Sequence, residues 1–406
     1  MRRAYKFRLR PTRGQHLRLQ ACLDGHRELY NAAPGTPRCL RGGGAALGGL
    51  LRSLPSEDAR PLRHPVGPVE RDQGCAPGDG RLVVLLAAGH PAPAGQGVQG
   101  VLPPGGLPEK PGYPRLEAEH RFDSVEWPSD GDGCRWKPEV SRVYLQGVGD
   151  VKVSAHRHVE GRVETIQVAR EGRRWALVLS VDDVAPRPLE PTGAVVGIDV
   201  GIASFVTTST GAHVDNPRWG RQAANRLGAA QRVLARKERG SGNRRRARET
   251  LSARHREVAN QRRDFHHETA RAVVVEADVI VVEDLRITRM LGRAKPRPDP
   301  KAPGAFLPNG AAAKTGLNRS ISDAGWGAFV AILRAKAEEA GRTVVDVDPR
   351  HTSDRCEACG HAARENRVSQ AVFRCRRCGH EAHADEHAAR NILRAGLALL
   401  AADEAA

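Results

Sequence analysis

Residues 356–392 have the sequence CEACGHAARENRVSQAVFRCRRCGHEAHADEHAARNI. This stretch contains two Cys-x-x-Cys pairs, Cys356 with Cys359 and Cys375 with Cys378. Each pair forms a tight knuckle on one side of a tetrahedral ion, so the spacing predicts a structural zinc site in a ribbon. Two such pairs rarely arise without a metal, although zinc alone would indicate only a binding module.

Three acidic residues occupy positions typical of a catalytic site. Asp199 ends one apolar strand, Glu283 ends another, and Asp385 opens the apolar helix after the ribbon. Ligand sites in an open α/β sheet gather at the carboxyl ends of strands, so these side chains could converge. Converged carboxylates repel one another unless hard divalent cations hold them, and such cations activate water and stabilise the leaving oxygen of a phosphodiester. We therefore predict a magnesium or manganese nuclease site, although any one such acid is more often a turn or cap residue.

Two histidines beside the third carboxylate have a simpler interpretation. His383 and His387 are expected at the surface or at the start of the helix. Four thiolates already complete a tetrahedral zinc site, so neither ring is needed as a zinc ligand.

The amino-acid composition and patterning change twice along the first half of the chain. Residues 5–10 alternate apolar or ring residues with basic ones and predict a strand, followed by a helix to about residue 30. Residues 34–108 are rich in Gly, Pro and Ala without sustained periodicity, so we expect them to be irregular and disordered. Residues 122–184 show short alternating segments with turn signals, which predict a small antiparallel barrel or sheet.

The second half has the order of an α/β domain. An apolar strand at 194–198 is followed by basic helical sequence from about 222 to 275, and then by a strand at 279–282. Asp323 is a plausible N-cap for a further helix. That helix carries one apolar stripe, made of Trp326, Phe329, Val330 and Leu333.

The charge of the chain points to a polyanionic partner. Its 64 Lys and Arg against 47 Asp and Glu give a formal net charge of +17. No segment approaches the roughly 18 consecutive apolar residues of a membrane span, so nucleic acid is the expected partner rather than a membrane. The other four cysteines show no pairing pattern, which favours a reducing interior, and we expect an intracellular protein.

These motifs together resemble a known family. Gly197-Ile198-Asp199-Val200-Gly201, Ile280-Val281-Val282-Glu283-Asp284-Leu285 and Ala384-Asp385 through Asn391-Ile392 are similar to the three RuvC motifs of the TnpB (OrfB) proteins of bacterial insertion sequences. Thr352-Ser353 before the ribbon and Asn260 through Phe265 resemble further hallmarks of the family. The resemblance covers residues 5–30 and roughly 111–393. TnpB proteins are RNA-guided nucleases similar to the type V CRISPR effectors.

The resemblance implies a fold and a function. It implies an RNase H-like RuvC nuclease domain at 190–353 and 384–406, interrupted by a zinc ribbon at 354–383. A split β-barrel wedge domain would comprise 1–10 and 111–189, and a helical recognition region would comprise 11–110. The expected protein is an RNA-guided, divalent-metal-dependent DNA endonuclease, a monomer in the cytoplasm or nucleoid. Its partners would be DNA and a transposon-derived guide RNA read by base pairing, and basic helices between Arg221 and Arg263 would line the nucleic-acid channel.

Two departures from the family leave an alternative open. His387 stands where the family usually has Asn, and residues 34–108 lack the periodicity of a helical recognition domain. We hypothesise that this segment is degenerate or translated out of frame. The alternative function is therefore an RNA- and DNA-binding relic, or a repurposed binder, without cleavage. A plain zinc-ribbon transcription factor is a third candidate, against which the strand-end carboxylates argue.

Overall fold

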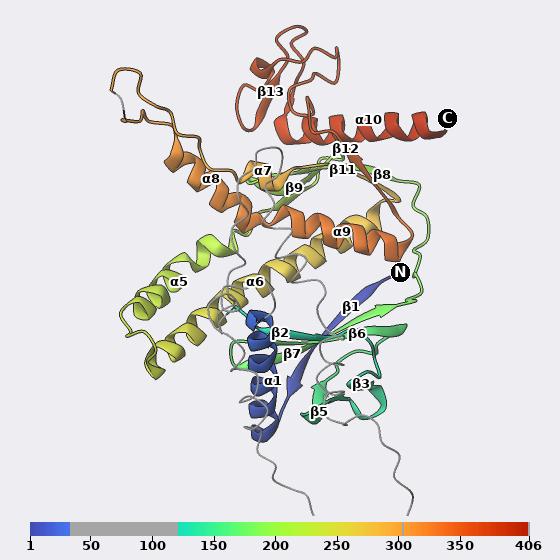
Figure 1. Cartoon of the computed structure of the whole chain (residues 1–406). Coiled ribbons are helices and arrows are strands. Elements are labelled where there is room, and N and C mark those ends of the chain that lie inside the picture. Colours follow the sequence, from blue (N-terminus) through green and yellow to red (C-terminus); the bar gives the residue numbers. More distant parts are fainter. Residues whose placement is uncertain (33–120, 303, 405–406) are drawn as a thin grey trace, which may run out of the picture. The chain divides into compact units, whose positions relative to one another are not determined.

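The computed structural model describes residues 1–32, 121–302 and 304–404. These residues form two compact units, one of residues 2–184 and one of residues 185–406 together with Met1 (Figure 1). The unusual segment at 34–108 lies outside the described residues, so the expectation of disorder there stays a prediction. No helix in the described ranges is long and apolar enough to cross a membrane.

The first unit is built on a seven-stranded antiparallel sheet with the order β2-β6-β7-β1-β5-β4-β3. Its elements are β1 (Arg3–Arg10), α1 (Arg13–Ala32), β2 (Ser124–Trp127), β3 (Cys134–Lys137), the short 3-10 helix η1 (Pro138–Val140), β4 (Arg142–Leu145), β5 (Gly149–Ser154), β6 (Arg162–Glu171) and β7 (Arg174–Asp182). The strand predicted at 5–10 is confirmed. It pairs with β5 and β7, so the start of the chain shares one sheet with residues from beyond 121.

The alternation along β1 explains its central place. Tyr5, Phe7 and Leu9 are buried, whereas the basic residues between them are exposed. Period-two alternation places one set on each face of the sheet. The sheet has β2 and β3 as its edges, so its pairing in the described residues is that of an open sheet and does not itself close a barrel.

The second unit combines a five-stranded sheet, several helices and a small two-stranded ribbon. Its elements are β8 (Val195–Val200), β9 (Ser204–Thr208), β10 (His213–Asp215), α5 (Trp219–Ala235), α6 (Gly242–Glu276), β11 (Val279–Glu283), α7 (Ile287–Met290), α8 (Ala311–Ala324), α9 (Trp326–Ala340), β12 (Thr343–Val347), the 3-10 helix η2 (Arg364–Asn366), β13 (Val372–Arg374), β14 (Glu381–His383) and α10 (Ala384–Glu404).

The five strands lie in the order β10-β9-β8-β11-β12. β8, β11 and β12 run parallel, while β9 and β10 are antiparallel additions beside β8. Helices α6 and α9 pack on one face of the sheet and α10 lies across the other (Figure 1). This is a mixed α/β fold in three layers.

Each face of the sheet has its own apolar core. Ile198 and Ile280 face α6 and α9, while Val281 faces α10 and packs against Ile392. The stripe predicted on α9 is confirmed, with Phe329 and Leu333 fully buried in the larger core.

Gly197 lets α10 approach the sheet closely. A Cβ at this position would lie 2.3 Å from the carbonyl oxygen of Ala389 and 2.7 Å from the backbone nitrogen of Leu393. Real side chains do not tolerate such contacts with backbone atoms, so only glycine fits here. The helix that begins beside Asp385 is therefore held against the strand that ends at Asp199.

The capping role predicted for Asp323 is wrong. Asp323 lies in the last turn of α8, and Gly325, with a φ of 70°, separates α8 from α9. The Asp323 carboxylate instead accepts hydrogen bonds from the backbone N–H groups of Gly220 and Arg221, in the first turn of α5. It therefore caps another helix, and a cap supplied by tertiary contact leaves no mark in local sequence.

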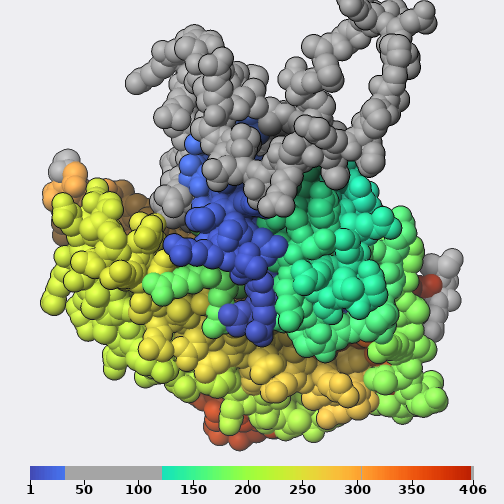
Figure 2. Space-filling model, turned by 90° about the horizontal axis from the view of Figure 1, so that it is seen from below, coloured from blue at the N-terminus to red at the C-terminus, as the bar shows by residue number. Residues whose placement is uncertain are grey.

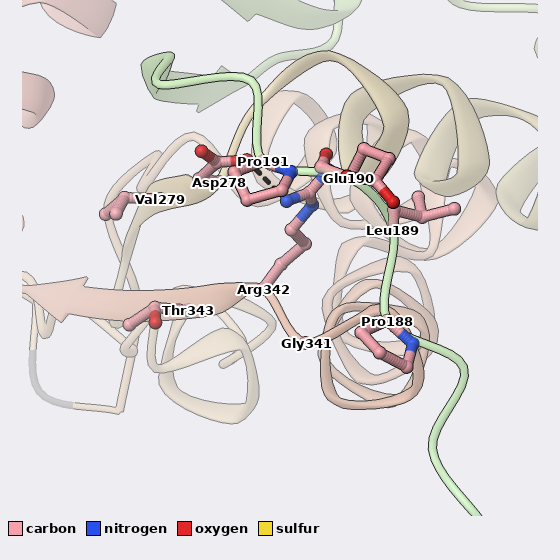
Figure 3. A pocket seen from close by; sticks show the side chains of 9 residues that line it. All are labelled: Pro188, Leu189, Glu190, Pro191, Asp278, Val279, Gly341, Arg342 and Thr343. Atoms are coloured by element: carbon pink, nitrogen blue, oxygen red, sulfur yellow. Dashed lines mark hydrogen bonds and ion pairs between the residues drawn. The ribbon is translucent and has the colours of Figure 1, made fainter.

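The proline-rich segment at 186–191 is anchored at the amino ends of the parallel strands. The guanidinium of Arg342, which is 8% exposed, forms an ion pair with Asp278 and donates to the carbonyl of Glu190. Asp278 also accepts from the backbone N–H groups of Thr192 and Gly193. Glu190, Asp278 and Arg342 border a cavity of about 500 Å³ (Figure 3). Because Asp278 and Thr343 adjoin the starts of β11 and β12, this cavity lies at the end of the sheet away from Asp199 and Glu283.

Candidate metal centres at the strand ends and in the ribbon

Asp199 and Glu283 lie side by side at the carboxyl ends of parallel strands. Val282 on β11 pairs with Ile198 on β8, and the two acids follow directly. Because side chains alternate along a strand, Asp199 shares a face with Gly197 and Glu283 shares one with Val281. Both Gly197 and Val281 contact α10. The two carboxylates therefore point toward the face that α10 covers.

Asp385 reaches the same place from the first turn of α10. Burial, followed by the negative charges of Glu283 and Asp385, raises the pKa of Asp199 to about 7. Burial also raises the pKa of Glu283. An isolated aspartate ionises near pH 4, and the contributions of Glu283 and Asp385 to the shift are in keeping with their positions at the neighbouring strand end and in the first turn of α10. We call Asp199, Glu283 and Asp385 the acidic cluster.

The acidic cluster is wider than a compact one-ion site. Among the described residues, three groups of possible metal ligands have all their ligand atoms within 4.8 Å of one another, and the acidic cluster is not one of these groups. Two-ion sites, with ions about 3.5–4 Å apart, spread their carboxylates more widely. Oxygen-only ligands are what magnesium and manganese prefer. The donor set therefore fits a pair of hard divalent cations.

Thr352, just before the ribbon, and Arg367, within it, contact the acidic cluster. The Thr352 hydroxyl donates to Oε1 of Glu283 at 2.6 Å, and this bond opposes the rise in the pKa of Glu283. The Arg367 guanidinium donates to Oδ1 of Asp385 at 2.8 Å and lowers the pKa of Asp199. Sequence reasoning noted Thr352 only as part of a motif and missed Arg367. A lone arginine in an irregular ribbon loop carries no periodic or spacing signal.

The four cysteines of the ribbon converge as predicted. The Sγ atoms of Cys356 and Cys378 are 3.6 Å apart, as are those of Cys359 and Cys375, and all four lie within 4.8 Å of one another. A tetrahedral zinc ion with Zn–S bonds of about 2.3 Å requires sulfurs about 3.8 Å apart. The thiols therefore fit a zinc ion.

His387 lies in the first turn of α10, one of the two places expected for it, and it is fully buried rather than at the surface. Its ring stacks on Phe373, and its Nε2 accepts a hydrogen bond from the backbone N–H of Glu357 at 3.2 Å. Burial lowers the pKa of His387 to about 4, in keeping with a neutral ring that accepts this bond. The ring therefore packs against the ribbon, a contact that local sequence does not reveal.

Asn391 fixes the same helix to the start of the ribbon. Its side-chain amide donates to the carbonyls of Thr352 and Arg355 at 2.9 and 2.7 Å. The residue is 5% exposed, and a buried amide that lost these partners would carry a desolvation cost. Residues 384–392 thus contain both Asp385 of the acidic cluster and a structural anchor, Asn391.

The basic helices predicted between Arg221 and Arg263 form a hairpin. α5 and α6 pack along each other, and the break falls at Ser241, whose hydroxyl caps α6 by accepting from the N–H of Arg244. The pair is exposed at the surface of its unit (Figure 2). The exposed cations of residues 221–263, which include the connection between the two helices, are Arg221, Arg226, Arg232, Arg236, Lys237, Arg239, Arg245, Arg246, Arg248, Arg254 and Arg263.

Comparison with known proteins assigns the chain to a family. It is 34% identical over 292 residues to a protein of Escherichia coli (strain K12) named "Putative RNA-guided DNA endonuclease InsQ", and the match covers 72% of this chain and 70% of that protein. The chain belongs to the OrfB (TnpB) family of IS605-type insertion sequences. Three family models match this OrfB protein: "Probable transposase" at 176–294, "Cas12f1-like, TNB domain" at 326–392 and "Helix-turn-helix domain" at 1–33.

Other relatives of this OrfB protein are matched over shorter stretches. A protein of Streptomyces pristinaespiralis named "Putative RNA-guided DNA endonuclease" is 34% identical over 236 residues, covering 58% of this chain and about half (52%) of that protein. A "CRISPR-associated endodeoxyribonuclease Cas12f1" of Sulfoacidibacillus thermotolerans is 51% identical over 57 residues, or 14% of each chain. A solved Cas12f1–sgRNA–target DNA complex is 16% identical with a TM-score of 0.39, over 66% of this chain and 59% of that one.

Proposed function

We propose that this OrfB-family protein is an RNA-guided DNA endonuclease whose catalytic residues are Asp199, Glu283 and Asp385. The observation that carries the proposal is geometric: Asp199 and Glu283 follow paired residues of parallel strands on the face that α10 covers, and Asp385 lies in the first turn of α10. Only Asp385 of the three is paired with a cation, Arg367, among the described residues, and such a concentration of carboxylates is typical of a catalytic metal site. The printed names of the relatives support the same activity.

The fold of the second unit supports a RuvC-like assignment. Three antiparallel strands followed by two parallel ones, with helices on both faces, is the arrangement expected of the RNase H-like domain implied by the family resemblance. In this proposal residues 190–353 and 384–406 form the nuclease domain and 354–383 the zinc ribbon. Residues 1–10 and 111–189 form the wedge domain, and 11–110 the recognition region.

The acidic cluster would hold two magnesium or manganese ions, and these would supply an activated water and stabilise the leaving oxygen of a phosphodiester. The residues of the chain prepare that site. Thr352 donates to one oxygen of Glu283, and within the described ranges no hydrogen bond engages the other. Arg367 donates to one oxygen of Asp385, and its positive charge beside the acidic cluster would attract a phosphate. Asp199, half protonated near neutral pH, must lose its proton before it can bind a cation.

Nucleic acids are the proposed partners. A transposon-derived guide RNA would read the target DNA by base pairing, while the protein binds the backbone. The exposed cations of α5 and α6 are suited to phosphate contacts, and the net charge of +17 has the same sign. We propose a monomer that acts in the cytoplasm at the nucleoid.

The test is plasmid cleavage by the chain purified with the RNA of its own element, in magnesium or manganese. Asp199→Ala, Glu283→Ala and Asp385→Ala should each abolish cleavage and leave RNA binding intact, because metal coordination is lost rather than phosphate contact. Asp215→Ala is the matched control, since Asp215 also ends a strand but is exposed. Full activity in any of the three alanine variants would remove that residue from the site.

The same assay separates the enzyme from a binding relic. A chain that carries RNA, binds its target and yet does not cut in either metal would overturn the endonuclease proposal and leave RNA-guided binding. The state of residues 34–108 bears on this outcome. Replacing them with a helical recognition segment of a relative should restore cutting if degeneration of that segment is the cause.

A further inference from the structure

A second group of metal-ligating side chains lies outside the acidic cluster and the cysteines. It consists of His213 on β10, His383 on β14 and Glu386 in the first turn of α10, which we call the His–Glu cluster. The three residues come from the edge strand of the sheet, from the end of the ribbon and from the helix that follows it. Their ligand atoms all lie within 4.8 Å of one another.

The side chains are oriented toward a common point. Nε2 of His213 is 3.2 Å from Oε1 of Glu386, and the rings of His213 and His383 meet edge to face with centroids 5.0 Å apart. Two ligands of a tetrahedral ion with bonds of about 2.0–2.2 Å are separated by about 3.3 Å. The spacing found here therefore suits an ion as well as it suits a hydrogen bond.

Hydroxyl groups support the orientation of His213. Ser204 Oγ and Thr207 Oγ1 each lie 3.3 Å from Nδ1 of His213. When Nδ1–H donates to these hydroxyls, the lone pair of Nε2 is free to bind a cation, and metal-ligating histidines nearly always have such a partner on the other nitrogen. Arg390 lies 3.6 Å from Oε2 of Glu386, which leaves Oε1 for the cluster.

The remaining group of possible ligands does not offer the same freedom. It consists of Glu357, His380 and His387. Nε2 of His387 already accepts the backbone N–H of Glu357, and Arg390 donates to both carboxylate oxygens of that residue. Those ligand atoms are engaged in a polar network, so this group is structural.

We propose that the His–Glu cluster binds one divalent transition-metal ion, such as zinc, cobalt or nickel. Imidazole nitrogens select these ions over magnesium, which prefers oxygen ligands. Three protein ligands leave a position for water, and exposure of the two histidines lets the ion exchange with solvent. The bound ion ties the edge strand β10 to the ribbon and to the first turn of α10, next to Asp385. The inference rests on this geometry and is independent of the endonuclease activity.

Cobalt is the probe, added to the 406-residue chain with its ribbon preloaded with zinc and with millimolar magnesium present. We expect one cobalt ion per chain by equilibrium dialysis and metal analysis. Its visible absorption should lack a thiolate charge-transfer band, since no cysteine is a ligand. Binding should also raise the Tm, because the ion binds the folded state.

Variants locate the ion. His213→Ala, His383→Ala and Glu386→Gln should each weaken cobalt binding at least about tenfold. Mutation of a residue that only hydrogen-bonds to a metal ligand already weakens metal binding by about this factor, and loss of the ligand itself should cost no less. His255→Ala is the matched control, since His255 is an exposed histidine of α6 far along the chain from the cluster. If His213→Ala fails to fold, as judged by circular dichroism, the cobalt affinity of His383→Ala tests the site instead, because His383 is exposed.

Three results would overturn the proposal. The first is that, at a millimolar cobalt concentration, the chain binds no cobalt in addition to the zinc in its ribbon. The second is unchanged affinity in His383→Ala and Glu386→Gln. The third is loss of the ion in Asp199→Asn but not in the His–Glu variants, because the ion would then belong to the acidic cluster.

Discussion

The close approach of α10 to β8 can be tested at Gly197. In Gly197→Ala the new Cβ would lie 2.3 Å from the carbonyl oxygen of Ala389 and 2.8 Å from Cβ of Leu393. The first contact is with helix backbone, so α10 must move away from the strand by a sizeable fraction of an ångström. Overpacking of this kind costs typically about 1–3 kcal/mol. In a domain of this size each kcal/mol lowers the Tm by about 2–4 °C.

The functional loss in Gly197→Ala should exceed the loss of stability. Gly197 is two residues before Asp199, and Ala389 is four residues after Asp385, so the displacement separates two members of the acidic cluster. A shift of about 1 Å in a catalytic group can reduce the rate about 100-fold. We therefore expect cleavage to fall by about that factor at a temperature where the variant is still fully folded.

The assay combines thermal unfolding with single-turnover plasmid cleavage. Gly316→Ala is the matched control, because Gly316 lies in the exposed part of α8 and a Cβ there meets nothing within 4 Å. This control should be stabilised by about 0.5–1 kcal/mol, as for a glycine replaced within a helix, and should cleave normally. Wild-type cleavage by a destabilised Gly197→Ala protein would refute the link between helix packing and the acidic cluster.

Four further predictions concern the ribbon and the acidic cluster. Cys375→Ser should release the tightly bound ribbon zinc and unfold the ribbon, as followed by metal analysis and limited proteolysis; retained zinc would argue against the four-thiolate site. The pKa of Asp199 is raised to about 7, so protons compete with magnesium for this carboxylate below that pH. The magnesium concentration that gives half-maximal cleavage should therefore decrease as the pH is raised from about 6 to about 8. A magnesium requirement that does not change with pH would contradict this. In the metal-free protein the same group lowers the free energy of unfolding as pH rises from about 4 to about 7. Thr352→Val should slow cleavage about tenfold or more by removing a hydrogen bond to a charged group, while Thr352→Ser should restore it.

Features with a local cause could be predicted from sequence. The strand at 5–10 follows from alternation, and the α9 stripe follows from helical spacing, since both patterns are imposed by the geometry of a single element. The convergence of the cysteines follows from their spacing, because each knuckle closes within four residues. The proximity of Asp199 and Glu283 follows from the rule that parallel strands end at one edge.

Features that depend on distant partners could not be predicted. Asp323 has the residue type of an N-cap in a suitable local position, but the helix that it caps begins about a hundred residues earlier in the chain. His387 is polar and close to an acid, yet the ring of Phe373 makes its site apolar. Arg367 meets Asp385 only because the ribbon folds back on α10. In each case the partner is set by the packed structure rather than by the neighbouring residues.

The ribbon is best understood as part of the acidic cluster's support. The chain reaches the ribbon just after Thr352, which donates to Glu283, and the ribbon itself contributes Arg367, which donates to Asp385. The ribbon ends at His383, and α10 begins at the next residue. Asn391 of α10 donates to the carbonyl of Thr352, so the helix after the ribbon is bonded to the segment before it. Zinc bound to the four cysteines would fix the interior of this loop, and an ion at the His–Glu cluster would fix its exit against β10. The position of Asp385 relative to the two strand-end acids therefore depends on the ribbon being folded, so loss of the ribbon zinc should weaken metal binding at the acidic cluster although the two sites share no ligand.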